Sequence, residues 1–421
     1  MAPLCAGIRV VTVPRFFHPF ARVAAGPEAF ISIVRGSGST VWDDLGTPYI
    51  DALASLWYCN IGHGRAEVAA AVAAQMGQLE VFHTFERFTN PAAEALCDRL
   101  AGRAPMPDAR VFLTSGGSEA VETAFKLVRL AHAAAGAPER TLIVSRVPSY
   151  HGVTYGAMSA TGLPLNQAGF GPLLPDVVGV GRDDLGALDA LLAERGDELA
   201  AIIAEPVIGA GGVYPPAPGY LAALRERCDR HGAFLIFDEV ICGFGRLGSF
   251  WAADHYGVRP DLVTFAKGVT SGYLPLGGVL VGAAVSAALA TDPTLVFRHG
   301  YTYSGHPTAC AAALANLDIL VAEDLPGRAV EIGRRLAAGL GELIDGDAVT
   351  EVRGAGAVWA MELGEGRTAL DVREELLARG VIARPLGTTA VAFCPPLVIS
   401  DAEIDRIVEA AGESAAAVRP G

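Results

Sequence analysis

The sequence predicts an α/β fold in which a mostly parallel sheet is covered by helices on both faces. Short apolar segments without polar–apolar alternation recur through the middle of the chain, and segments with a helical pattern separate them. A strand that is apolar on both sides is typical of a parallel sheet with two covered faces. The chain from about residue 311 onward is rich in helices and predicts a second, smaller α+β unit.

The expected elements alternate along the chain. The predicted strands are 111–114, 141–144, 201–204, 233–237, 262–265 and 278–281. The first helix is expected over 118–132, with Gly136 as its stop, and another over 220–230, ending near Gly232. An Ala-rich helix is expected after the strand 278–281.

Composition and charge narrow the class of protein. The chain has 421 residues, of which 51% are hydrophobic and 19% charged, so it is globular and long enough for two domains. The net charge of −14 repels nucleic acid and anionic membranes, and neither is expected as a partner.

Cysteine and histidine usage predicts neither a disulfide framework nor a metal site. The seven cysteines are scattered, odd in number and without a CxxC pair, and the nine histidines form no HExxH pattern. A reducing, cytoplasmic compartment is therefore expected. At the N-terminus, Arg9, Pro14 and Arg15 interrupt the apolar run that a signal peptide needs.

One uncharged stretch, between Lys267 and Asp292, is long enough to span a bilayer. Pro275 and the pair Gly277–Gly278 interrupt it, and small residues dominate it. We therefore interpret it as a loop, a buried strand and a helix.

Polar or ionisable residues follow four of the predicted strands. The turn 115–118 follows the first strand, and Glu205, Asp238 and Lys267 each follow a later one. Ligands of open α/β sheets bind beyond the carboxyl ends of the strands, so these groups are expected to converge on one crevice.

The turn, the lysine and the carboxylates at these strand ends suit different parts of one ligand. A Gly/Ser-rich turn opening a helix binds an anion such as phosphate. A desolvated lysine has a lowered pKa and forms Schiff bases, and a carboxylate keeps a pyridine nitrogen protonated. Together they describe a pyridoxal 5′-phosphate (PLP) site. Taken singly, the turn and Asp238 are more often helix caps, and Lys267 a solvated loop residue.

At these residues the sequence resembles the class III (omega) aminotransferases, which have the fold of type I PLP-dependent transferases. The resemblance runs through nearly the whole chain and lies in eight segments: LWYCNIGHGR (56–65), TSGGSEAVETA (114–124), SYHG (149–152), AEPVIGAGG (204–212), FDEVICGFGRLG (237–248), FAKGVTSGYLPLGG (265–278), HGYTYSGHP (299–307) and RPLG…CPP (384–396). It implies a small domain built from residues 1–50 and 311–421 around a large PLP-binding domain of residues 51–310.

The resemblance implies how the cofactor is held. Lys267 carries it as a Schiff base, and Asp238 bonds the ring nitrogen. Gly117 and Ser118 hold the phosphate. Thr302 reaches the phosphate in the neighbouring subunit, which implies a homodimer or a higher oligomer with shared active sites.

Further residues are assigned to the ring and its surroundings by the same resemblance. Tyr150 stacks on one face of the ring with His151 behind it, and Val240 packs on the other face. Glu205 lies near Asp238 and the ring hydroxyl; His151 and Glu205 remain open to an indirect, supporting role.

The substrate pocket is assigned to Trp57, Phe85 and Tyr150, and the substrate carboxylate to Arg384. Trp57 and Phe85 could instead be core aromatics, and Arg384 a structural ion-pair partner. The implied reaction is ping-pong: a small-molecule amine gives its amino group to the cofactor, with Lys267 as general base, and a keto acid then takes it.

Three positions depart from common patterns of the family. Cys242 and Leu247 stand where members often have Thr, near the expected cofactor region, and leave the substrate range open. Members that use 2-oxoglutarate often carry Arg after the SYHG segment, where this chain has Val153. That favours a monocarboxylate acceptor such as pyruvate.

An aminomutase or a decarboxylating transaminase would use the same residues. A nucleotide-binding oxidoreductase would need GxGxxG after an early strand, which the chain lacks. An inactive structural protein would not need Lys267, Asp238 and Arg384 together.

Overall fold

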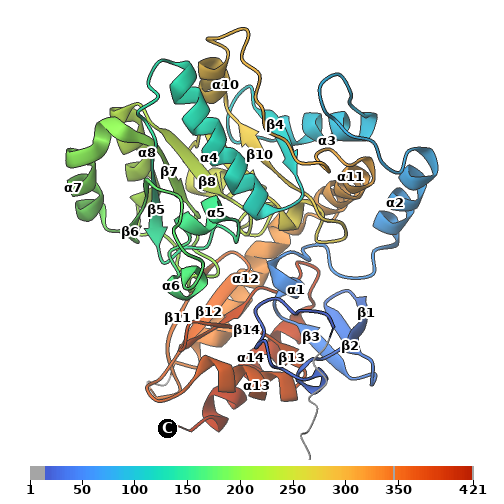
Figure 1. Cartoon of the computed structure of the whole chain (residues 1–421). Coiled ribbons are helices and arrows are strands. Elements are labelled where there is room, and N and C mark those ends of the chain that lie inside the picture. Colours follow the sequence, from blue (N-terminus) through green and yellow to red (C-terminus); the bar gives the residue numbers. More distant parts are fainter. Residues whose placement is uncertain (1–14, 345–346, 420–421) are drawn as a thin grey trace, which may run out of the picture.

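The computed structural model describes residues 15–344 and 347–419. Cys5, Arg9 and Pro14, which entered the cysteine and signal-peptide arguments, lie outside the described residues. The chain forms a large upper part and a smaller lower part, and its N-terminal and C-terminal segments meet in the lower one (Figure 1).

The large part is built on a seven-stranded sheet of order β4-β10-β9-β8-β7-β5-β6. Its strands are β4 (Arg110–Thr114), β5 (Leu142–Val147), β6 (Val177–Gly181), β7 (Leu199–Ala204), β8 (Phe234–Asp238), β9 (Leu262–Phe265) and β10 (Gly277–Val281). All six predicted strands are present, and β6 is the one that the sequence reading missed. Strands β5 to β9 pair in parallel, whereas β10 is antiparallel to both β4 and β9.

Helices cover both faces of this sheet, as the apolar strands predicted. Successive residues of a strand point to opposite faces: Ile202 belongs to one apolar cluster and Ile203 to the other. One face packs against α4 (Gly117–Ala134), α5 (Tyr155–Ala160) and α10 (Ala283–Leu289). The other packs against α3 (Pro91–Ala101), α7 (Leu185–Arg195), α8 (Tyr220–His231) and α11 (Pro307–Ala322).

The lower part holds two four-stranded sheets. One has the order β1-β2-β3-β13, with β1 (Ile33–Ser37), β2 (Thr40–Asp43), β3 (Pro48–Asp51) and β13 (Val381–Ile382). The other has the order β11-β12-β15-β14, with β11 (Val349–Ala355), β12 (Val358–Leu363), β14 (Arg384–Leu386) and β15 (Ala390–Phe393). Because β13 pairs in parallel with β3, the two ends of the chain share a sheet.

The helices of the lower part come from the C-terminal third of the chain. They are α12 (Leu325–Gly341), α13 (Ala369–Ala378) and α14 (Asp401–Ala417). Ser400 and Glu403 form a capping box at the start of α14, which satisfies backbone N–H groups that the helix leaves free. Helix α11 contacts α2 and α3, so residues 311–322, expected in the small domain, pack with the large part.

The remaining elements are short or peripheral: η1 (Pro27–Ala29), α1 (Ala54–Trp57), α2 (Ala66–Gln78), α6 (Pro164–Gln167), η2 (Gly196–Glu198), α9 (Ala252–Tyr256) and η3 (Lys267–Val269). The uncharged stretch after Lys267 forms η3, a loop, β10 and α10, as its small residues and Pro275 predicted. Within the described ranges, no helix combines the length and the apolar character needed to cross a membrane.

Candidate active site

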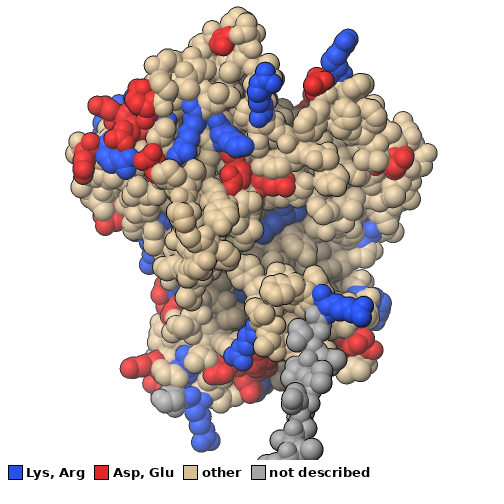
Figure 2. Space-filling model, in the orientation of Figure 1, with Lys and Arg blue, Asp and Glu red and all other residues tan. Residues whose placement is uncertain are grey.

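A cavity of about 610 Å³ opens between the upper and lower parts. Its lining combines the ends of β7, β8 and β9 with residues of α1, the N-terminal segment and β14. Figure 2 shows a hollow at this level, walled mostly by uncharged side chains with a basic group in its depth. The volume lies within the range of small-molecule sites.

The three ionisable groups expected at strand ends meet in this cavity. Glu205 follows β7, Asp238 ends β8 and Lys267 follows β9, and all three line the cavity wall. They converge because β7, β8 and β9 are neighbouring parallel strands whose carboxyl ends lie at one edge of the sheet.

Asp238 is a buried carboxylate with a fixed orientation. Its Oδ2 lies 2.7 Å from Nδ1 of His151, and its Oδ1 accepts a hydrogen bond of 3.1 Å from the backbone N–H of Val240. Nε2 of His151 is buried and has no hydrogen-bond partner among the described residues. The carboxylate is thus held where it can accept a further hydrogen bond from a ligand in the cavity.

Glu205 holds the backbone around Tyr150. Its Oε1 accepts from the N–H of Tyr150 and its Oε2 from that of Gly209, both at 2.9 Å. Burial raises the pKa of Glu205; His151 opposes this shift and Asp238 adds to it. Two buried acids that interact cannot both be charged without cost unless a cation or a hydrogen-bond donor joins them.

Lys267 is the basic group of this wall. Burial lowers the pKa of its ammonium group, and the nearby Asp238 and Glu205 only partly oppose the shift. Its backbone φ of 46° is left-handed, which is uncommon for a residue with a side chain. None of the described residues forms a hydrogen bond or ion pair with its amine, which is therefore free to react.

The first turn of α4 presents free backbone N–H groups beside the same cavity. Gly117 and Ser118 line the wall, and the helix has no side-chain cap, so its first N–H groups are available. Ser118 Oγ accepts from the N–H of Val153 at 3.0 Å. A Cβ on Gly152 would collide with Ser118, so glycine is required at this turn.

Arg384, at the start of β14, faces the same cavity. Burial lowers the pKa of its guanidinium, and Tyr150 partly opposes that shift. Its Nε is buried without a partner, and no described carboxylate forms an ion pair with it. An unpaired guanidinium in a partly buried cavity is costly, which indicates a ligand that carries an anionic group.

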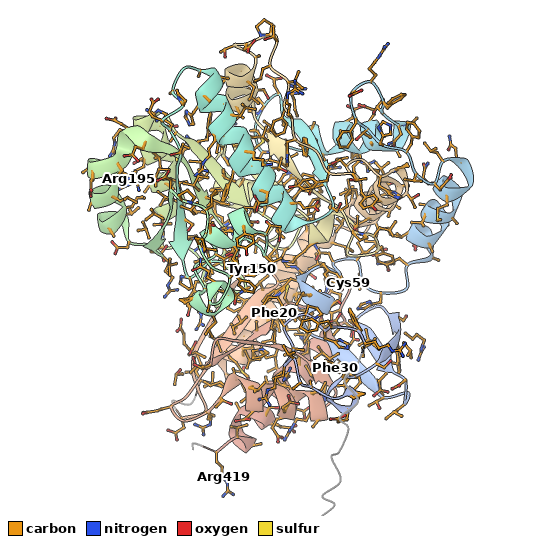
Figure 3. The ribbon with its side chains drawn as sticks, viewed as in Figure 1. Phe20, Phe30, Cys59, Tyr150, Arg195 and Arg419 are labelled. Carbon is orange, nitrogen blue, oxygen red and sulfur yellow. The ribbon has the colours of Figure 1, made fainter. Side chains whose placement is uncertain are left out.

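Aromatic and apolar residues complete the wall. Trp57 is buried and lines the cavity with Tyr150, as expected, and Val240 lies against Gly117. Sequence reasoning missed other lining residues, which lie mostly on loops: Pro19, Phe20, Leu56, Leu163, Asn166, Ala210, Ile241, Pro385 and Gly387. Phe20 and Tyr150 both lie at the junction of the two parts (Figure 3).

Two expected site residues stand outside the cavity of their own chain. Phe85 and Thr302 are exposed, and neither lines the cavity. They belong to neighbouring loops, which are joined by a hydrogen bond of 2.8 Å from Thr84 Oγ1 to the carbonyl of Ser304. The expectation that Phe85 lines the pocket is therefore not met within one chain.

The three departures from the family pattern also lie away from the cavity wall. Cys242 and Leu247 belong to a small buried cluster with Val207 and Ala252, and the Cys242 thiol donates to the carbonyl of Val207. Val153 is exposed. Cys242 and Leu247 thus act as core residues, since none of the three lines the cavity.

Comparison with known proteins decides the family. The family model described as aminotransferase class-III matches residues 23–413. The chain belongs to the class-III aminotransferases. As a class-III aminotransferase it is a PLP-dependent transaminase, with the type I fold expected from its sequence.

Relatives of this aminotransferase align with its sequence or structure over most of their length. A probable aminotransferase of Mycobacterium tuberculosis is 39% identical, with 96% of this chain and 93% of the relative covered. The putrescine–pyruvate aminotransferase of Pseudomonas aeruginosa is 36% identical over 89% and 88% of the two chains. A PLP-bound amine transaminase from an uncultivated Pseudomonas species superposes with a TM-score of 0.92, at 38% identity, over 97% of this chain and all of the other.

The cavity of this aminotransferase fits PLP. The first turn of α4 offers free N–H groups for a phosphate, and Asp238 offers a buried acceptor for a ring nitrogen. The unpartnered amine of Lys267 lines the same cavity. The phosphate, the ring nitrogen and the reactive carbon of the cofactor would thus each meet a complementary group of the wall.

From this geometry we expect Lys267 to be the attachment point of the cofactor. Borohydride reduction of the purified holoenzyme should fix the cofactor irreversibly onto Lys267, because its amine lines the cavity, has a lowered pKa and has no competing partner. Peptide mass mapping measures the adduct. Lys126, the exposed lysine of α4, is the internal control and should stay unmodified; an adduct on any other lysine would contradict the assignment.

Proposed function

We propose that the enzyme transfers an amino group from an amine or omega-amino acid donor to pyruvate by a ping-pong mechanism. The observation that carries this proposal is the unpaired guanidinium of Arg384, in the same cavity as the free amine of Lys267. This arrangement supports a pocket that binds two substrates in turn, a keto acid with a carboxylate and an amine donor without one. A guanidinium matches a carboxylate in bidentate geometry.

The chain's own groups have distinct roles in this proposal. When bound, the cofactor supplies a carbon that accepts the amino group and a ring that takes up an electron pair. Gly117 and Ser118 would bind its phosphate, and Asp238, oriented by His151, would keep its ring nitrogen protonated. Tyr150 and Val240, which also line the cavity, would hold its ring.

Proton transfer is assigned to Lys267. Its Nζ would take the proton from the donor carbon and hold it for return to the transferred group. A neutral amine is needed for the first step, and the burial that lowers the pKa of Lys267 favours that form. Glu205 keeps the Tyr150 backbone in place through its hydrogen bond of 2.9 Å.

Pyruvate is the proposed acceptor for two reasons. Val153 is exposed next to the cavity-lining Gly152 and stands where members that use 2-oxoglutarate often have the longer Arg side chain, so a second acceptor carboxylate would lack that partner. A relative named putrescine–pyruvate aminotransferase is 36% identical over most of both chains. An aminomutase or a decarboxylating transaminase is the nearest alternative, and each would be recognised by its products.

We propose that two copies of the chain share their active sites. Phe85 and Thr302 lie exposed on joined loops outside their own cavity, and Val296 and Tyr303 add exposed apolar surface to this region. A two-fold dimer would place such loops at the partner's cavity and bury the surface. The scattered cysteines remain the argument for a reducing, cytoplasmic location.

A donor screen tests the proposed reaction. With pyruvate as acceptor, primary amines, diamines and omega-amino acids should each be tested for formation of alanine, measured by chromatography. At least one donor class should give one alanine for each aldehyde or ketone released. Equal rates with 2-oxoglutarate would contradict the acceptor assignment, and products retaining the amino group would indicate an aminomutase.

Replacing Arg384 should separate the two half-reactions. In Arg384→Ala, the half-reaction with pyruvate or alanine should lose about 1.5–3 kcal/mol of stabilisation, the contribution of a hydrogen bond to a charged group. The half-reaction with a carboxylate-free amine should change little. Single-turnover absorbance kinetics measure both, and Arg384→Lys, which keeps the charge but not the bidentate geometry, should lie in between. Equal slowing of both halves would mean that Arg384 is structural.

Shared sites predict complementation between inactive chains. Lys267→Ala and Thr302→Glu chains, mixed under conditions of subunit exchange, should form hybrid dimers with one doubly altered site and one intact site. Activity should return to about a quarter of the wild-type value, because half of the dimers are hybrids with one working site each. Exchange is verified by native mass spectrometry; hybrids without activity would exclude site sharing through Thr302.

A further inference from the structure

The segment that carries Trp57 into the cavity has an unusual backbone. Ala54, Ser55 and Trp57 have φ values of 48°, 60° and 68°, a left-handed region that residues with side chains rarely adopt. Three such residues within four positions cannot persist unless the surroundings impose the conformation. Leu56 and Trp57 both line the cavity, so the strained segment forms part of its wall.

A buried carboxylate holds this segment. Asp51, the last residue of β3, is only 2% exposed. Its Oδ1 accepts from the N–H of Leu53 at 3.2 Å, and its Oδ2 accepts from the N–H of Ser55 at 2.6 Å. The carboxylate thereby satisfies backbone donors inside the left-handed turn and favours that turn over an extended chain.

His63 holds the carboxylate in turn. Its Nε2 lies 2.8 Å from Asp51 Oδ2, and because a carboxylate only accepts, Nε2 carries the proton. The backbone of His63 exchanges two hydrogen bonds with Gly38, of 3.0 and 2.8 Å. A Cβ on Gly36 would lie 2.8 Å from His63 Cβ. The glycine at this position of β1 therefore leaves room for the His63 side chain.

The same segment is joined to the strand pair that carries Arg384. Asp51 pairs with Ile382 in the parallel ladder of β3 and β13, and Cys394 donates its N–H to the carbonyl of Ala52 at 2.7 Å. Trp57 and Leu386 pack in one apolar cluster. The Asp51 carboxylate thus lies where the segment that carries Trp57 joins the strands that carry Arg384 and Leu386.

We infer that Asp51 and His63 are positioning residues for donor selectivity: they hold the strained 53–57 backbone and thereby set the width of the pocket at Trp57. Neither residue lines the cavity, so their effect is transmitted through the backbone. The selectivity part rests on the proposed amine-donor function. The backbone part does not depend on any substrate.

Asp51→Asn tests the inference in the holoenzyme. An amide cannot accept at both of its polar ends, so the N–H groups of Leu53 and Ser55 lose one acceptor. With pyruvate as acceptor, the kcat/KM ratio of 2-aminobutane to 1-phenylethylamine should fall about tenfold, mainly through KM, since a relaxed wall admits the larger amine. Hydrogen-exchange mass spectrometry should show faster exchange in peptides covering 52–57.

A matched control exists in the same sheet. Asp43, at the end of β2, is 6% exposed and accepts from the N–H groups of Leu45 and Thr47 at 3.0 and 2.7 Å and from the Tyr49 hydroxyl at 3.0 Å. It caps a turn that does not line the cavity. Asp43→Asn should speed exchange at 44–48 and leave the donor ratio unchanged.

Variants at His63 keep the test decisive if Asp51→Asn does not fold. His63→Ala should shift exchange and selectivity in the same direction, and His63→Gln, which can still donate to Asp51, should restore both. The inference is overturned if folded variants keep wild-type exchange at 52–57, or if Asp43→Asn shifts selectivity equally. Faster exchange in an enzyme that aminates pyruvate from no amine donor would contradict the proposed function alone.

Discussion

Charge balance among the ionisable groups of one cavity is the constraint on which this site depends. Two acids, Glu205 and Asp238, and two bases, Lys267 and Arg384, face one space between the upper and lower parts. Asp238 is held by His151 and Glu205 by backbone N–H groups, whereas neither base has an ionic partner among the described residues. The wall therefore stabilises a ligand with its own anionic groups, and a phosphate-bearing cofactor and a carboxylate substrate both meet that need.

Some residues of the cavity wall have a strained backbone. Lys267 and Trp57 both have left-handed φ values, and each such residue costs about 1–3 kcal/mol. The cost is offset by the rigid surroundings. Asn316 of α11 donates to the carbonyls of Gly268 and Val269 at 2.9 Å, directly after Lys267, and Asp51 accepts from the turn before Trp57. Buried polar side chains thus position the reactive parts of the wall without entering it.

The two-part architecture explains why so many separate chain segments reach one site. The parallel strands of the upper part deliver Glu205, Asp238 and Lys267 to one edge of a sheet, where their positions are fixed by the ladder. The lower part delivers Arg384 and Trp57 from sheets that the two ends of the chain build together. The upper and lower parts thus both contribute charged groups to the cavity. The width of the cavity depends on how the two parts pack against each other.

Sequence reasoning identified the parallel sheet, its covering helices and the strand-end residues, because apolar periodicity and strand-end chemistry are local properties of the chain. Glu205, Asp238 and Lys267 could be placed together since neighbouring parallel strands end at one edge. Only the tertiary structure decided the antiparallel direction of β10, the burial of Cys242 and Leu247 away from the cavity wall, and the exposure of Phe85 and Thr302. The direction of a strand, the burial of a side chain and the lining of a cavity depend on contacts between separate segments of the chain, such as Asp51 with His63 and Asp238 with His151. No local sequence pattern encodes such contacts.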